Sequence, residues 1–456
     1  MERTTDLLER NANPRLALEA MMGSWSAVTV AAKREQEPGS VRRMATGARF
    51  CYIVPVTART QHSWRPIVTH PCPSLLTAEA LLRRASDMVP LLRERAVHTE
   101  HLRRLPDETV QDILSSGLHR IAVPKRYGGL DVGYHVMLAV GAELARGCAA
   151  TAWCYSLWSA HAWLVGHWPR EAQEEFFADG PDVLCSSSLS PSGVQLELAP
   201  GGFRLSGRWE FSSGCDSAGW LILGALESGA LRWALIPRSD CEIVDTWFVS
   251  GLRGTGSKDI VVDDAFVPSH RVLDMARAGD GDWTGWEMHG QARYRLPIAP
   301  LLGWDLVSPM VGIGQGMIEE FTAQLTGTSG PGRTAESAAV QIRLAEASAE
   351  VDAARMLMGH DVREMLGKAK TGASFTMMER ARYRRDKAFV VGLCLRAVNR
   401  LFDLSGGHSL FDSVPLQRFH RDAQAVAHRE GLIMDLAGQQ YGRVALGLEP
   451  TASRGL

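Results

Sequence analysis

The sequence lacks the features that would tie it to a metal, a disulfide framework or a charged partner. Its eight cysteines stand singly, without a CxxC pair or a Cys/His cluster at metal-ligand spacing. This pattern argues against a structural zinc and favours a reducing cytoplasm. The 49 Lys and Arg residues balance 51 Asp and Glu residues, so no net field favours nucleic acid or a membrane surface. We therefore expect a small and largely uncharged ligand.

Long hydrophobic runs are also missing. Residues 1–22 carry mixed charge and no apolar core of the kind that a secretory signal has. The apolar stretch 306–318 is too short for a membrane span and is interrupted by Pro and Gly. These absences predict a cytoplasmic protein without a membrane or nucleic-acid partner.

The chain does contain ample apolar material and a clear change of period. With 456 residues, 45% hydrophobic, it can bury a core distributed over two or three lobes. Residues 1–74 lack sustained periodicity and are interpreted as a poorly ordered extension. Helical spacing over 75–182 gives way to short β-type runs over 183–290, and returns over 291–450. The prediction is an α+β protein, mainly α: an N-terminal helical domain, a central β-barrel or sandwich, and a C-terminal helical bundle.

Two segments are the candidates for chemistry: "GRWEFSSGCDSAGW" (207–220) and "GLRGTGSKD" (251–259). The second resembles a phosphate-cradling loop, because its glycines permit close backbone approach while Thr255 and Ser257 offer hydroxyls. A hairpin turn explains the glycines equally well, since the strand–loop–helix context of a dinucleotide fingerprint is absent. In the first segment the serines either bond a ligand or, as is common at strand ends, bond backbone. The residues alone leave both readings open.

The two segments occur together with "SLWSAHAWLVGHW", "SSSLSPSG", "RARYRRD", "LQRFHRDAQA" and "YGRVALGL". In their order and spacing, these motifs resemble the acyl-CoA dehydrogenase fold over residues 75–450. Within that fold the chain is most similar to the flavin-dependent monooxygenases, such as the 3-hydroxy-9,10-secoandrostatrienedione and p-hydroxyphenylacetate hydroxylase oxygenase components. The resemblance is specific for fold and flavin dependence and less specific for substrate.

The resemblance implies a two-component monooxygenase. A separate reductase would supply reduced flavin, FADH2 or FMNH2, which with O2 gives a C4a-hydroperoxide that hydroxylates an aromatic, phenolic or polycyclic substrate. It also implies a homotetramer in which residues 404–411 reach a neighbouring subunit's flavin. Acyl-CoA dehydrogenase-type oxidation and flavin-dependent N-oxygenation of an amine are the alternatives. Against the dehydrogenase, "SSSLSPSG" lacks the Thr-Glu-Pro element typical of that place.

The resemblance also assigns the flavin contacts. Ser213 would be the hydroxyl beside the reactive part of the flavin, and Arg253 the cation that balances anionic reduced flavin. The remaining contacts would lie along the isoalloxazine ring or its phosphate side. The full set is Trp209, Phe211, Ser212, Ser213, Arg253, Gly254, Thr255 and Ser257.

For the substrate side the resemblance points to histidines. His161, in an apolar aromatic segment, matches a family histidine near the substrate phenol, although a core histidine bonded to backbone is the alternative. Ungapped counting from "RDA" places Arg429 where the family has its catalytic base. His428 is one residue away, and Glu430 occupies the place of the dehydrogenases' catalytic Glu. The identity of the base thus stays open between His428 and Glu430.

Overall fold

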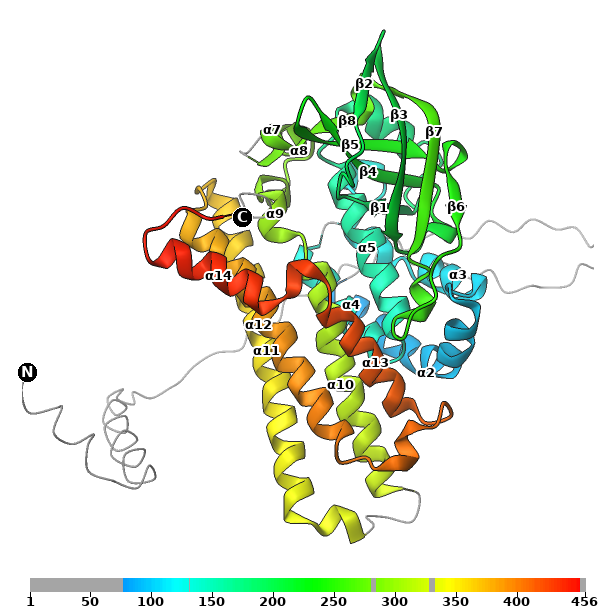
Figure 1. The fold of residues 1–456 in the computed structure, drawn as a ribbon, viewed down its shortest axis with the longest axis vertical. Coiled ribbons are helices and arrows are strands. Elements are labelled where there is room, and N and C mark those ends of the chain that lie inside the picture. Colours follow the sequence, from blue (N-terminus) through cyan, green and yellow to red (C-terminus); the bar gives the residue numbers. More distant parts are fainter. Residues whose placement is uncertain (1–76, 131, 280–283, 328–332, 452–456) are drawn as a thin grey trace, which may run out of the picture. The chain divides into compact units, whose positions relative to one another are not determined.

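Helices and strands follow one another in the order that the hydrophobic pattern predicts. The computed structural model describes residues 77–130, 132–279, 284–327 and 333–451. The predicted extension, residues 1–74, lies outside the described residues. Within the described ranges all strands fall between Cys185 and Asp274, with helices before and after them (Figure 1).

Five α-helices precede the sheets in the described part of the chain, and one of them, α5, packs against strand β1. Helix α5 is buried around almost its whole circumference, as expected of a helix in a protein interior. It packs against α4, α10 and strand β1, so its side chains reach both the helical and the sheet regions. The helices of this group are α2 (Ala78–Leu102), α3 (Asp107–Ser116), α4 (Tyr134–Ala145), α5 (Ala149–Val165) and α6 (Arg170–Phe176).

Two four-stranded sheets form the middle of the chain (Figure 1). Their inner faces share a small apolar core that includes Leu205, Trp209 and Ile260, which confirms the predicted sandwich. The first sheet has the order β1 (Cys185–Ser188), β4 (Trp220–Glu227), β5 (Ala230–Pro237), β8 (Val272–Asp274). The second has the order β2 (Leu196–Ala199), β3 (Gly202–Ser212), β7 (Lys258–Pro268), β6 (Glu242–Val244).

Long helices return after the sheets, as predicted for the bundle. Figure 1 shows α11 and α12 running side by side, with α10 and α13 adjoining them. Three short helices, α7 (Met275–Gly279), α8 (Thr284–His289) and α9 (Ile298–Leu301), link the sheets to the bundle. The bundle helices are α10 (Trp304–Thr326), α11 (Ala338–Thr371), α12 (Met377–Phe402), α13 (Pro415–Ala427) and α14 (Met434–Ala445).

Helix α10 runs through Pro309 without a break. Proline has no N–H to donate to the carbonyl four residues earlier, which here belongs to Asp305. The hydroxyl of Ser308 donates to that carbonyl instead, at 3.3 Å, so the acceptor is not left unsatisfied. No helix in the described ranges combines the length and apolarity needed to cross a bilayer.

The loop between β6 and β7 is docked on helix α13. A Cβ placed on Gly251 would clash with the backbone carbonyl of Arg421, and one on Gly254 would clash with Thr99 of α2. The close approaches that these glycines permit are therefore made to the protein itself. Nothing in these contacts requires a phosphate to explain the glycines.

Replacing Gly251 with alanine should destabilise the fold. The added methyl group must push the loop away from α13, which costs about 1–3 kcal/mol for a crowded site. Gly367→Ala is the matched control, because Gly367 lies within α11 with nothing near its Cβ position, and alanine there should add about 0.5–1 kcal/mol. Thermal and urea unfolding measure both effects, and equal stability of the two variants would contradict the docking account.

Candidate functional site

Strand β3 ends in a bulge that turns Phe211 outward. The pairing register with β7 shifts between Trp209 and Ser212. Phe211 adopts a φ of 65° and leaves 57% of its surface exposed. A left-handed conformation costs a residue with a side chain about 1–2 kcal/mol. Strain of this kind gathers at functional sites, and the exposed ring lies edge-on to Trp247 at 6.1 Å between centroids.

Ser213, directly after the bulge, collects hydrogen bonds from three parts of the chain. The indole Nε1–H of Trp153 on α5 donates to its Oγ at 3.1 Å, and Ser257 shares a bond with the same oxygen at 2.7 Å. Ser186 on β1 donates to its carbonyl at 2.8 Å. The Ser213 hydroxyl is therefore fixed in position from the helix, the loop and the sheet at once.

The loop that follows β6 supplies both buried hydroxyls and an exposed cation. Thr255, at the end of the 3₁₀ helix η6 (Arg253–Thr255), bonds Ser257 at 2.7 Å, and both side chains are buried. Arg253, which precedes both hydroxyls in the sequence, is exposed. Its Nε–H donates to the Val249 carbonyl at 2.8 Å. The loop thus turns its hydroxyls inward and its guanidinium outward.

Helix α13 holds this loop through a buried carboxyl. Asp422 accepts the backbone N–H of Leu252 at 2.6 Å. Burial raises the pKa of Asp422 to about 7. Its neighbour Arg421 donates to the Ser250 carbonyl at 2.6 Å and pairs with Glu100 of α2 at 2.8 Å.

His161 lies about two turns after Trp153 along α5, and its hydrogen bonds fix its tautomer. Nδ1 lies 2.7 Å from the carbonyl of Cys185, which only accepts, so Nδ1 carries the proton. Nε2 is then the acceptor for the hydroxyl of Ser187 at 2.9 Å. Burial lowers the pKa of His161 to about 4, which keeps the imidazole neutral near pH 7.

The three residues around the predicted base position lie at a helix end. Helix α13 stops at Ala427, so His428 is its C-cap and not part of a continuing helix. The exposed imidazole of His428 bonds the Gln424 carbonyl through Nδ1 at 2.7 Å. Arg429 and Glu430 are also exposed, although desolvation by nearby protein atoms lowers the pKa of Arg429.

The predicted flavin contacts divide into an inner and an outer group. Trp209 is fully buried in the sandwich core, and its Nε1–H donates to the Gly224 carbonyl at 2.7 Å. Ser212 is likewise buried and bonds Ser186 at 2.8 Å. Phe211 and Arg253 face outward. Within the described residues no hydrogen bond links His428 or Glu430 to the cluster around Ser213.

Three residues of this site do not appear among the sequence predictions: Ser186, Ser187 and Asp422. All three lie inside motifs that the resemblance used, "SSSLSPSG" and "RDA". Successive side chains of a β-strand point to opposite faces, and this alternation distinguishes Ser186 from Ser187. It turns Ser186 toward Ser213 and leaves Ser187 on the side of His161.

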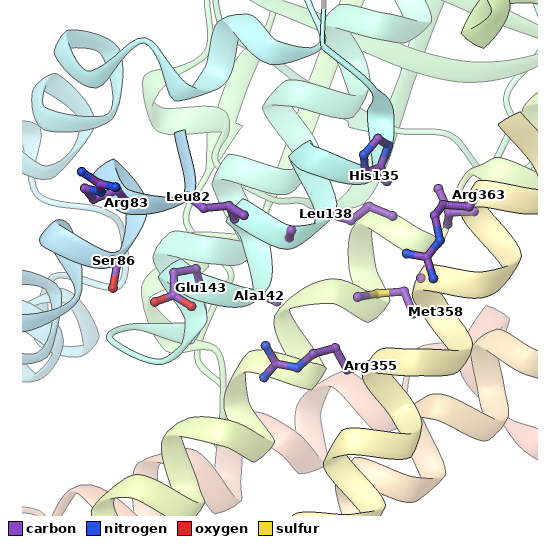
Figure 2. Close-up of a pocket in the computed structure, with 13 residues that line it drawn as sticks. Leu82, Arg83, Ser86, His135, Leu138, Ala142, Glu143, Arg355, Met358 and Arg363 are labelled. Carbon is purple, nitrogen blue, oxygen red and sulfur yellow. The ribbon is translucent and has the colours of Figure 1, made fainter. Parts of the chain in front are cut away.

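A cavity of about 530 Å³ lies elsewhere, between α2, α4 and α11 (Figure 2). Figure 2 shows Arg355 and Arg363 of α11 across from Leu138 of α4. None of the predicted site residues lines it. We place the candidate site at Ser213, because the hydrogen-bonded groups and the strained residue converge there.

Known proteins resemble this chain over most of its length. Family profiles described as acyl-CoA dehydrogenase N-terminal and C-terminal domains match residues 80–179 and 306–432. The FADH(2)-dependent resorcinol hydroxylase oxygenase component of Rhizobium sp. is 36% identical over 81% of this chain and 95% of its own. The crystal structure of 3-HSA hydroxylase from Rhodococcus sp. RHA1 superposes with a TM-score of 0.78, at 32% identity, covering 82% of this chain and 98% of that one. XiaF from Streptomyces sp., solved with FADH2 and glycerol, gives 0.76 at 28% identity, covering 82% of this chain and 97% of that one.

The buried His161 should make stability depend on pH. Its pKa is about 4 in the folded chain against about 6.5 when unfolded, so between these values only the unfolded chain binds the proton. Stability is lost as pH falls through this window, by at most about 1.4 kcal/mol per pH unit. Urea unfolding from pH 4.5 to 7.5 should show a shallower dependence for His161→Gln. Identical slopes for wild type and variant would contradict the assignment, and His289, with a similarly lowered pKa, contributes equally to both.

Proposed function

We propose a mechanism from the premise that this chain belongs to the flavin-dependent monooxygenase oxygenase components of the acyl-CoA dehydrogenase family. It is the oxygenase of a two-component system, and uses reduced flavin and O2 to hydroxylate an aromatic compound. Because a 36% identical relative is FADH2-dependent, we take FADH2 as the flavin and a phenol as the substrate. The observation that supports the mechanism best is the Ser213 hydroxyl, held by Trp153 and Ser257 two residues after the outward-facing Phe211.

The residues present fit a flavin. A flat aromatic ring system needs aromatic faces, and Phe211 and Trp247 offer them at the bulge. Reduced flavin is anionic near neutral pH, and the exposed guanidinium of Arg253 supplies the opposite charge. Bound reduced flavin would supply the electrons that activate O2 for transfer of one oxygen atom to the ring.

The protein would position the flavin and exclude water from the site. Ser213 would place one hydroxyl at the flavin's reactive edge, while Trp153 and Trp158 close the site from the α5 side. Trp158 donates to the Gly214 carbonyl at 3.3 Å, and both indoles are buried. Exclusion of water by such walls keeps activated oxygen from being released as peroxide. Trp209 and Ser212 would support the site from within the strand.

On the substrate side His161 orients and does not ionise. Its neutral Nε2 holds the proton of Ser187, so the Ser187 oxygen presents lone pairs to a phenol hydroxyl. The lowered pKa of His161 makes a buried imidazolium unfavourable at neutral pH. Ser187 and His161 would therefore orient the phenol hydroxyl, and another group that reaches the same hydroxyl would take its proton.

We assign that deprotonation to His428. Because its Nδ1–H donates to the Gln424 carbonyl, its Nε2 is unprotonated and available in the neutral imidazole. Glu430 is exposed to solvent. The same exposure removes the desolvated pocket that an acyl-CoA dehydrogenase base would need.

The partners follow from the two-component chemistry and from the surface. A separate reductase must supply reduced flavin. Leu410 and Phe411 are 68% and 61% exposed at the 3₁₀ helix η10 (Gly407–Leu410), which is unusual for adjacent large apolar side chains. We propose that a neighbouring subunit of a homotetramer covers them, and that the assembly works in the cytoplasm.

A reductase-coupled assay tests the function itself. The chain with a flavin reductase, NADH, FAD and a panel of phenols should yield hydroxylated product, and removal of the reductase should abolish it. FAD that is reduced chemically should restore a single turnover. Failure of every phenol, together with no binding of reduced flavin, would reject the proposal.

Substitution should separate the two candidate bases. His428→Gln should lower kcat about 10²-fold at pH 7, and part of the loss should return at pH 9, where the phenol ionises without help. Glu430→Gln should change kcat less than threefold. A large loss confined to Glu430→Gln would transfer the role to that residue, and no loss in either would show that neither is the base.

A further inference from the structure

Four consecutive hydrogen bonds link Trp153, through Ser213, to the loop between β6 and β7. The indole of Trp153 lies 3.1 Å from Ser213 Oγ, which is 2.7 Å from Ser257 Oγ. Ser257 Oγ is 2.7 Å from Thr255 Oγ1, and that oxygen lies 2.9 Å from the carbonyl of Leu252. All three hydroxyls are buried, so bulk water does not compete for their protons.

The two ends of this hydrogen-bond chain allow one arrangement in which every proton has an acceptor within the protein. An indole N–H only donates and a carbonyl only accepts. Thr255 gives its proton to Leu252, so Ser257 must donate to Thr255, and Ser213 must donate to Ser257. Four protons then serve four bonds with none left over. In this arrangement Ser213 turns its proton inward and offers the site one lone pair, which makes it an acceptor.

The same atoms can also form the hydrogen bonds with the donors and acceptors exchanged between Ser213, Ser257 and Thr255. If Thr255 donates to Ser257, and Ser257 to Ser213, the proton of Ser213 is free to point into the site. The carbonyl of Leu252 then loses the Thr255 hydroxyl, but still accepts Trp247 Nε1–H at 3.0 Å and the Thr255 backbone N–H at 3.1 Å. In this direction only the Ser213 hydroxyl proton lacks a partner within the protein, and a ligand in the site would have to accept it.

We propose that Thr255 and Ser257 are positioning residues, which act through Ser213 as a reversible hydroxyl chain and let it accept from reduced flavin and donate to oxidised flavin. The inference rests on the proposed flavin site. The two redox states differ at one ring nitrogen, which carries N–H when reduced and a lone pair when oxidised. A single hydroxyl with a reversible proton matches both states.

This role differs from direct contact with the cofactor. Thr255 and Ser257 donate their hydroxyl protons to other groups of the protein, and neither side chain is exposed. Their effect on a ligand should therefore appear as a preference between redox states and not as a general loss of affinity.

The test compares Thr255→Val with Thr255→Ser. Valine keeps the shape but removes the acceptor for Ser257, whose proton then goes to Ser213 and leaves Ser213 only able to donate. Dissociation constants are measured for oxidised FAD in air and for FADH2 under anaerobic conditions. Thr255→Val should weaken FADH2 about five- to tenfold relative to FAD, the scale of one hydrogen bond. Thr255→Ser, which keeps the hydroxyl, should retain the wild-type ratio.

The outcomes separate this inference from the function beneath it. If the two constants change by the same factor in Thr255→Val, the substitution has only loosened the loop and the inference is wrong. If wild type binds neither redox state, the flavin site itself is wrong. Should Thr255→Val fail to fold, Ser257→Ala provides the second measurement, because Ser213 loses its inward acceptor and the ratio should shift the same way. An unchanged ratio there would also overturn the inference.

Discussion

The buried carboxyl of Asp422 holds the backbone N–H of Leu252, and the arrangement of the site follows from this one contact between the bundle and the sheets. Leu252 has a left-handed φ of 52°, which a residue with a side chain adopts at some cost. The chain then turns so that Arg253 faces out while Thr255 and Ser257 face in. Together with the bond from Arg421 to the Ser250 carbonyl, that contact holds the loop whose Ser257 hydroxyl reaches Ser213.

The site is built where three kinds of structure meet. Helix α5 contributes indoles and an imidazole, the sheets contribute a strained bulge and two serines, and α13 contributes the carboxyl that anchors the loop. Each polar group that is buried there has a partner within the protein. The exposed Phe211 and Arg253 offer an aromatic face and a positive charge, which suit a flat, negatively charged ligand.

Much of this was predictable, because hydrophobic period and motif order are local properties of the sequence. The change from helical to strand spacing and back places the sandwich correctly, and the motif set identifies the family. The hydrogen-bond partners of individual serines were not predictable. Ser212 and Ser213 are both buried and have the same chemistry, yet Ser212 bonds Ser186 within the sheet while Ser213 bonds Trp153 and Ser257. The glycines of the loop left two interpretations open, a ligand-binding loop and a turn, because the sequence does not show that α13 and α2 occupy the space beside Gly251 and Gly254. The helix end at Ala427 likewise decides how His428 is presented, and a count along the sequence does not show it.

The central claim is that the fixed hydroxyl of Ser213 keeps activated oxygen on the path to product. The most direct measurement is the ratio of hydroxylated product to hydrogen peroxide in the reductase-coupled reaction of wild type and Ser213→Ala, at equal oxygen consumption. The account predicts that wild type gives mainly product and that Ser213→Ala releases most of the oxygen as peroxide. A Ser213→Ala enzyme that retains the wild-type ratio would contradict it.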